Sequence, residues 1–207
     1  MTQTPLRIAT SGQQEQDQQQ DQQFIYSGIT WQQFKLIQAG FADSRGIRLF
    51  YYNNIIEILM PGRTHESFSR FIGFLISLFC LEQNIEFEPT GSMTQEREGE
   101  VSVEPDESFC FGTSKTTPDL VIEVVFTSGG TKKLPRYQVL SLPEVWFWQD
   151  GEFNLYHLRD SGYELISSSE IPELVNLDIA LLTQCLTIAQ TSRLEAANTF
   201  RNALKSR

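Results

Sequence analysis

The sequence predicts an α/β or α+β domain, in which helices cover the faces of a mixed β-sheet. Residues 64–83 carry apolar side chains at the i, i+3, i+4 and i+7 spacing of an amphipathic helix. Residues 120–126, LVIEVVF, are apolar almost throughout, as in a central strand covered on both faces. The 207 residues, of which 40% are hydrophobic, suffice for one domain with a sizeable core.

Charge and composition argue against several classes of protein. The net charge of −10 disfavours a surface with general affinity for nucleic acids or membranes, although it permits a local basic groove. Three scattered cysteines without a CxxC motif predict a reducing compartment and no structural zinc. Apolar runs of about a dozen residues fall short of the roughly 20 that span a bilayer, and no signal peptide is evident. We therefore expect a cytoplasmic protein.

The N-terminal segment differs in composition from the rest of the chain. Residues 10–23, TSGQQEQDQQQDQQ, are polar and of low complexity, so they cannot bury enough surface to offset the entropy of ordering. The sequence therefore predicts a disordered, Gln-rich tail over residues 1–23 and one folded domain over residues 24–207. An interaction role for the Gln-rich segment is the alternative.

The first part of the domain predicts a helix, a hairpin and a longer helix. Thr30 precedes WQQFKLIQA, whose apolar spacing and N-cap-like threonine are typical of a short helix. Two β-rich runs then flank Asn53 and Asn54, residues that tolerate positive φ and favour a tight hairpin. The amphipathic helix follows, with Thr64 as its expected N-cap.

The second part of the domain is mainly strands. Short strands are expected before the central strand, and a helix with Pro135 in its first turn is expected after it. Proline is tolerated there because a backbone N–H in the first turn has no acceptor within the helix. A three-stranded β-meander and two C-terminal helices complete the expected order. The strands are expected at 85–89, 91–97, 100–112, 120–126, 144–149, 152–159 and 162–168, and the helices at 131–142, 177–190 and onward to Arg207.

Three acidic residues lie where strands should be apolar. Glu57 interrupts IIEILM, Asp106 ends VSVEPD, and Glu123 interrupts the central strand. A buried carboxylate is costly unless it is paired or holds a cation. Carboxylates that converge at one end of a sheet suit Mg²⁺ or Mn²⁺, and Lys133 beside them would orient a water or stabilise charge on a phosphate. The alternative is that each acid faces solvent on an alternating strand.

Several segments together carry a resemblance to a known family. They are IIEILMPGRTHESFSRFI, EPDESF and PDLVIEVV followed by TKKLPRYQVLSLPEVWFW. In this order they resemble the Uma-two-type family of restriction endonucleases, within the PD-(D/E)XK nuclease superfamily, over roughly residues 28–185. The resemblance implies a restriction-endonuclease-like fold, with a mixed central sheet flanked by helices.

The resemblance also implies a metal site. It assigns Asp106 and Glu123 as ligands of Mg²⁺ or Mn²⁺, and Glu57 as a third ligand or as the residue that positions the lysine. Asp119 also follows a proline, but it lies four positions before Glu123, about 13 Å along a strand. That separation is too long for one cation, so Asp106 is favoured.

The lysine departs from the superfamily pattern. Members often carry it two residues after the glutamate, where this chain has Val125. The resemblance moves the role to Lys133 on the following helix, with Lys132 as the alternative. His65 would bind phosphate or act as an acid, and Lys132 and Arg136 would contact the substrate.

The function that the resemblance implies is a Mg²⁺-dependent endonuclease that hydrolyses phosphodiester bonds of DNA. A homodimer is expected, because cutting both strands needs two sites. The alternative is a catalytically silent protein with a nuclease fold and an interaction or regulatory role, which the acidic composition and the displaced lysine suit. A different metal-dependent phosphoester hydrolase is a third possibility.

Overall fold

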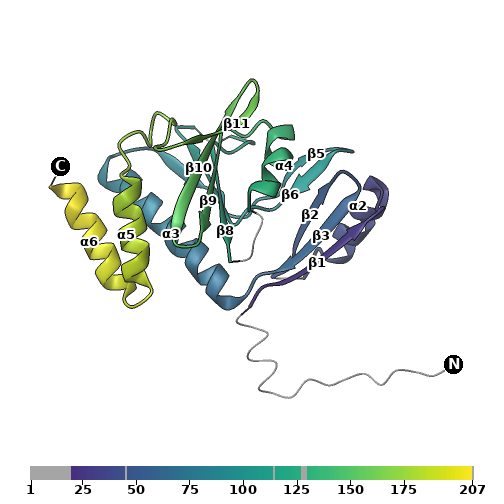
Figure 1. Cartoon of the computed structure of the whole chain (residues 1–207), viewed down its shortest axis with the longest axis horizontal. Coiled ribbons are helices and arrows are strands. Elements are labelled where there is room, and N and C mark those ends of the chain that lie inside the picture. The colour runs from purple at the N-terminus through teal and green to yellow at the C-terminus, as the bar shows by residue number, and fades with distance from the viewer. Residues whose placement is uncertain (1–19, 45, 114, 127–129, 207) are drawn as a thin grey trace, which may run out of the picture.

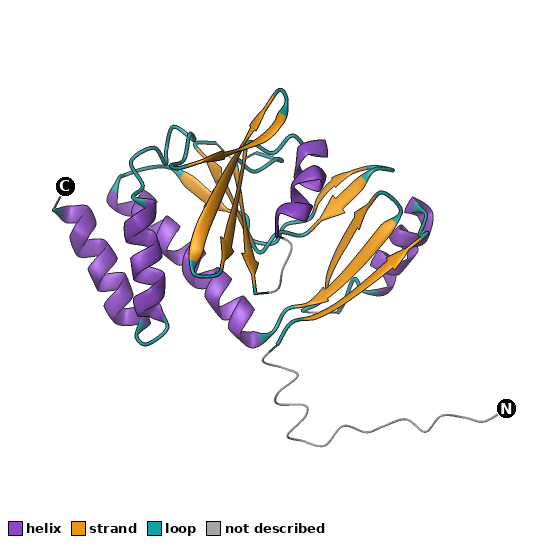
Figure 2. Ribbon diagram, in the orientation of Figure 1, coloured by secondary structure: helices purple, strands orange, loops and turns teal. Residues whose placement is uncertain are grey.

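The computed structural model describes residues 20–44, 46–113, 115–126 and 130–206 of the chain. Most of the predicted tail, residues 1–19, lies outside these ranges. The predicted boundary at Phe24 is two residues late, because the first strand, β1, already begins at Gln22. The strands form two sheets (Figures 1 and 2), whereas the sequence predicted one central sheet.

The first sheet has five strands, in the order β1-β3-β2-β6-β5, all antiparallel to their neighbours. Its central hairpin turns at Asn53 and Asn54, whose φ values of 50° and 59° match a turn with two left-handed residues. The strands are β1 (Gln22–Ser27), β2 (Arg48–Tyr52), β3 (Ile55–Met60), β5 (Gln95–Arg97) and β6 (Val101–Val103).

Helix α2 (Trp31–Gly40) covers the outer face of this sheet. Thr30 caps it as predicted, and the side chain of Gln33 accepts a hydrogen bond from the N-cap backbone, which completes a capping box. Phe34 is fully buried against the strand residues Leu49 and Ile56. The helix therefore seals this side of the sheet.

The second sheet has six strands, in the order β11-β10-β9-β8-β7-β4. Only the β8–β9 pair is parallel among these strands, because the segment η1 (Gly130–Lys133) and helix α4 (Leu134–Val139) carries the chain back between them. The other strands are β4 (Phe87–Pro89), β7 (Glu107–Phe111), β8 (Leu120–Val125), β9 (Glu144–Gln149), β10 (Glu152–Arg159) and β11 (Gly162–Ile166).

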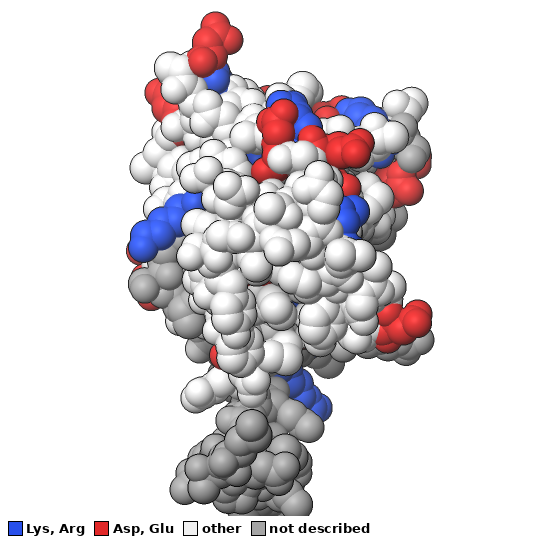
Figure 3. Space-filling view, turned by 90° about the vertical axis from the view of Figure 1, so that its right-hand side faces the viewer, with Lys and Arg blue, Asp and Glu red and all other residues white. Residues whose placement is uncertain are grey.

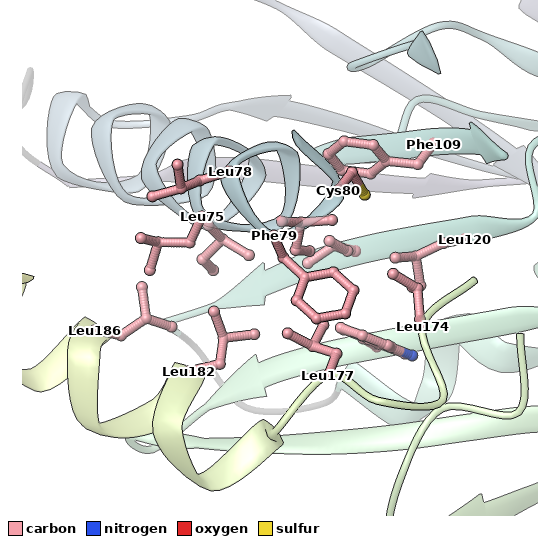
Figure 4. Close-up of a cluster of buried hydrophobic side chains, with 14 of the residues drawn as sticks. Leu75, Leu78, Phe79, Cys80, Phe109, Leu120, Leu174, Leu177, Leu182 and Leu186 are labelled. Atoms are coloured by element: carbon pink, nitrogen blue, oxygen red, sulfur yellow. The ribbon is translucent and has the colours of Figure 1, made fainter. Parts of the chain in front are cut away.

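The three other helices, α3, α5 and α6, cover one face of the six-stranded sheet (Figure 1). Figure 4 shows Leu75 and Phe79 of α3 meeting Leu182 and Leu186 of α5 in the largest apolar cluster. The helices are α3 (Arg63–Glu82), α5 (Ile179–Ala189) and α6 (Arg193–Lys205). Helix α3 begins at Arg63 with Gly62 as its N-cap, so the prediction of Thr64 as the cap is wrong. No helix in the described ranges combines the length and the apolarity needed to cross a membrane.

Strand β8 is buried on both faces, as its apolar sequence predicted. Leu120, Ile122 and Val124 belong to the cluster shared with α3, whereas Val121 and Val125 belong to a second cluster between the two sheets. Strand alternation therefore directs Glu123, which lies between Val121 and Val125, into the layer between the sheets.

Candidate active site

The candidate site lies in the layer between the two sheets. Glu57 on β3 shares a strand face with Leu59, and Glu123 on β8 shares one with Val121. Both apolar residues belong to the inter-sheet cluster, so the two acids enter the same layer from opposite sheets. Helix α4 and the turn before it also enter this layer. The fold thus explains why two central strands carry acids.

Glu123 is 1% exposed and has two donors. Lys133 Nζ donates to Oε2 at 2.6 Å, and the Tyr137 hydroxyl donates to Oε1. Tyr137 is fully buried, and burial together with the adjacent Glu123 charge raises the pKa of its phenol well above the ordinary value of 10.0. The phenol therefore remains a proton donor to Glu123 across the physiological range.

Asp106 lies where the chain passes from one sheet to the other, between β6 and β7. In the register that pairs Glu107 with Ile122, the preceding residue Asp106 falls opposite Glu123. Its Oδ2 accepts a hydrogen bond from the Val124 backbone N–H at 2.6 Å. Asp106 and Glu123 therefore lie beside each other, with Asp106 3% exposed.

The other oxygen of Asp106 is held by two cationic or protonatable groups. Oδ1 contacts the Arg48 guanidinium and lies 2.8 Å from His65 Nε2. Arg48 opens β2 and is itself buried. Sequence reasoning missed this residue, although an arginine at the start of the apolar run RLFYY is itself an out-of-place charge.

His65 joins two carboxylates. Its Nδ1 lies 2.8 Å from Asp21 Oδ2, while its Nε2 faces Asp106. Burial would raise the pKa of Asp21, but the hydrogen bonds from His65 and the Gly62 N–H outweigh it and hold that pKa below 3.8. Asp21 lies inside the predicted tail, so no local pattern in the sequence singled it out.

Glu57 belongs to a neighbouring ion pair. Arg136 Nη1 lies 2.7 Å from Oε2, and Gln23 Nε2 donates to Oε1 at 2.7 Å. Burial would raise the pKa of Glu57, but Arg136 and Lys133 outweigh it and hold that pKa below 4.5. The structure thus places Glu57 against Arg136, and Lys133, which contacts Glu123, also attracts the Glu57 charge.

A cavity of about 210 Å³ opens onto this group of residues. Glu57, His65, Lys132, Lys133 and Arg136 line it, so it collects five of the seven residues that the sequence singled out. Lys132 is exposed, whereas the carboxylates of Asp106 and Glu123 lie behind the cavity wall. We call this space the inter-sheet cavity.

The donor chemistry fits a divalent metal ion. Within the described residues, no three His, Cys, Asp or Glu side chains are grouped as metal ligands. Mg²⁺, however, is commonly held by one or two carboxylates, with waters and substrate phosphate oxygens completing its shell. Adjacent Asp106 and Glu123 match that requirement. Asp119, the other aspartate that follows a proline, instead accepts hydrogen bonds from Lys115 and the Phe111 backbone.

Comparisons with known proteins agree with the fold. A family model, Uma2, described as "Putative restriction endonuclease", matches residues 31–189. A crystal structure described as a putative nuclease belonging to DUF820 from Anabaena variabilis superposes with a TM-score of 0.53 at 17% identity, covering 76% of this chain and 99% of that one. No curated protein matches the chain. The structural likeness confirms the predicted restriction-endonuclease-like fold class.

Proposed function

The chain belongs to the Uma2 family described above, and from that premise we propose that it is a metal-dependent endonuclease that hydrolyses phosphodiester bonds of DNA. One observation carries the proposal: Lys133 Nζ contacts Glu123 directly beside Asp106, at the wall of the inter-sheet cavity. Two carboxylates and a lysine in this arrangement can hold a metal ion and serve a reacting phosphate.

The proposed roles follow from these positions. Asp106 and Glu123 would hold Mg²⁺ or Mn²⁺, which supplies charge neutralisation and a water of lowered pKa when bound. Lys133 lines the cavity and its Nζ contacts Glu123, so it would orient the attacking water and stabilise negative charge on the phosphate. Glu57 holds Arg136, and both Arg136 and the exposed Lys132 are placed to contact a phosphate.

His65 is proposed as a positioning residue. Because its two ring nitrogens face Asp21 and Asp106, it fixes the orientation of the Asp106 carboxylate. We propose this role in place of the phosphate-binding or acid role that the sequence suggested, since each ring nitrogen lies 2.8 Å from a carboxylate oxygen.

The decisive experiment compares Glu123→Gln with Glu144→Gln. Glu144 is also a buried strand glutamate, but it binds Trp146 and Ser169 on the α3 side of the sheet. We expect wild type to cut plasmid DNA with Mg²⁺ or Mn²⁺ and to gain melting temperature from the metal. Glu123→Gln should lose both effects, and Glu144→Gln should keep them at temperatures where it is folded. Cleavage by Glu123→Gln at the wild-type rate would disprove the proposed site.

A second candidate function is a catalytically silent interaction or regulatory protein. The specific observation in its favour is that each buried acid already has a cationic partner: Asp106 has Arg48, Glu123 has Lys133 and Glu57 has Arg136. Such pairs neutralise the site without a metal. If Mg²⁺ and Mn²⁺ leave the melting temperature of wild type unchanged and no DNA is cut, this function replaces the first.

A homodimer and a cytoplasmic location complete the proposal. Two copies would bring two sites to a duplex, so light scattering should give twice the chain mass of 23.7 kDa. All three cysteines are buried as free thiols, in keeping with a reducing compartment.

A further inference from the structure

A second cavity, of about 670 Å³, adjoins the inter-sheet cavity. The two share Val125 and Phe126 as lining residues, at the end of β8. Three aromatic side chains line the second cavity: Phe68, Phe126 and Trp148. Phe68 contacts both other rings, with centroids 6.2 Å from Phe126 and 5.5 Å from Trp148. We call this space the aromatic pocket.

Phe126 is the exposed member of the three. Its side chain is 51% exposed, although large apolar residues in this chain are mostly buried. The His65 ring contacts it edge-on, at 5.6 Å between centroids. A half-exposed ring that is held by edge-on contacts with two neighbouring rings can serve as a platform on which another flat group stacks.

Two arginines at the aromatic pocket, Arg63 and Arg193, have no acidic partner among the described residues. Every other described arginine lies within 4.0 Å of a carboxylate. Arg193 donates to Ser67 Oγ and packs its guanidinium over the Phe71 ring. In a chain of net charge −10, a pocket with two arginines that form no ion pair and with one acid, Asp150, favours an anionic ligand.

From these contacts we propose that the aromatic pocket binds an unpaired nucleotide of the DNA, next to the phosphate that is cut; this rests on the proposed nuclease function. The base would stack on Phe126, and Arg63 and Arg193 would contact phosphates on either side of it. Asp150 and Gln190, which also line the pocket, offer hydrogen-bond partners for the edge of a base. A pocket of this volume is within the range of small-ligand sites.

The aromatic pocket would select for the form of the DNA. A base held in it must be unstacked from its neighbours, which costs least when the base is already unpaired. The protein is therefore expected to prefer single strands, or duplexes with an unpaired base, over perfect duplexes. Aromatic stacking accepts every base, so this preference should not depend on sequence.

The test is DNA binding by the full chain in EDTA, where cleavage does not interfere. Fluorescence anisotropy would compare a perfect duplex, the same duplex with one unpaired base, and the single strand. Phe126→Ala should weaken binding to the two unpaired forms by about tenfold and leave the perfect duplex unchanged. Arg63→Gln and Arg193→Gln should weaken binding to all three forms, because phosphate contacts do not depend on pairing.

The matched control is Phe74→Ala, since Phe74 is a phenylalanine of similar exposure on α3 that does not line the pocket. It should bind like wild type. Equal binding of wild type to the three DNA forms, or an unchanged preference in Phe126→Ala, would overturn the inference. Phe126→Tyr, which retains a ring, should keep the preference, and unchanged binding of the perfect duplex by Phe126→Ala would exclude a folding defect in that variant. A normal preference without metal-dependent cleavage would support the pocket and overturn the proposed nuclease function instead.

Discussion

Glu123 carries a charge into a strand that is buried along its whole length, and its nearest cation comes from a different element, the turn η1. A buried carboxylate that loses its partner keeps the full cost of its desolvation. Lys133 is 16% exposed and Glu123 1%, so water can compensate only part of that loss. This pair is therefore the residue-level contact on which both stability and the proposed chemistry depend.

Replacing Lys133 tests this contact. We expect Lys133→Met to lower the free energy of unfolding by about 2–4 kcal/mol, because Glu123 then keeps only Tyr137. Mn²⁺ should restore more stability to the variant than to wild type, since it no longer competes with an ammonium group for Glu123. Urea denaturation with and without Mn²⁺ measures both effects. Lys132→Met is the control, because Lys132 is exposed and should change stability little.

Tyr163 gives a prediction on pH. Its hydroxyl donates to the Leu142 carbonyl at 2.7 Å, and burial raises the pKa of its phenol above 10.0. The unfolded chain ionises near pH 10 while the folded chain keeps its proton, so stability is greatest below pH 10 and falls as the pH rises beyond it. Tyr163→Phe should cost about 1 kcal/mol near pH 8. That difference should vanish near pH 11 in urea melts; a constant difference would contradict the shifted pKa.

Residue-level reasoning on the sequence reached both partners of some ion pairs in the site, such as Glu123 and Lys133, but only one partner of others. Glu57, Asp106 and Glu123 interrupt apolar runs, which is visible without a structure. Arg48 and Asp21 were missed, because the pairs that include them join residues distant in the chain. The metal-binding and catalytic roles remain predictions.

At the scale of elements, local patterns predicted most of the secondary structure. The hairpin at Asn53 and Asn54, the capped helix α2 and the buried strand β8 are confirmed, because each follows from chemistry within a few residues. Strand β1 was missed, since a Gln-rich composition resembles that of a disordered tail. The division into two sheets was also missed, because it depends on pairings between distant strands that no local pattern encodes.

The hairpin turn offers a test at this scale. Asn54 has a φ of 59°, a conformation that costs an alanine about 1 kcal/mol and costs glycine nothing sterically. Asn54→Ala should therefore lower stability by about that amount, whereas Asn54→Gly should match or slightly exceed wild type. Thermal unfolding of the two variants measures this difference. Equal melting temperatures would mean that the turn relaxes to another conformation.

At the scale of the whole molecule, the distribution of charge matters more than its total. Figure 3 shows the side of the molecule nearest α2. The middle of this face is mostly uncharged, and Lys, Arg, Asp and Glu side chains gather toward its top. Among the described lysines and arginines, four have no carboxylate within 4.0 Å: Arg63, Lys132, Arg193 and Lys205. Three of them line the two adjoining cavities, so the unpaired positive charge of the described residues is concentrated at the proposed DNA site.

This distribution predicts a weak dependence of DNA binding on salt. Three phosphate contacts to a single strand give a slope of about −2 when the logarithm of the binding constant is plotted against that of the salt concentration. Anisotropy titrations at rising NaCl concentrations would measure it, with Arg193→Gln expected to make the slope shallower by less than about one. A slope steeper than about −5 would show that the DNA covers a much larger basic surface.

The position of Asp106 at the passage between the sheets has a consequence for when the molecule can act. Its contacts come from three places: Arg48 in one sheet, the backbone of Val124 in the other, and His65 on α3. No single element supplies all of these contacts. The environment of Asp106 is therefore complete only after both sheets and the helix have docked. If the chain is the endonuclease that we propose, a newly made or damaged copy whose sheets have not docked would lack the site and could not cut DNA.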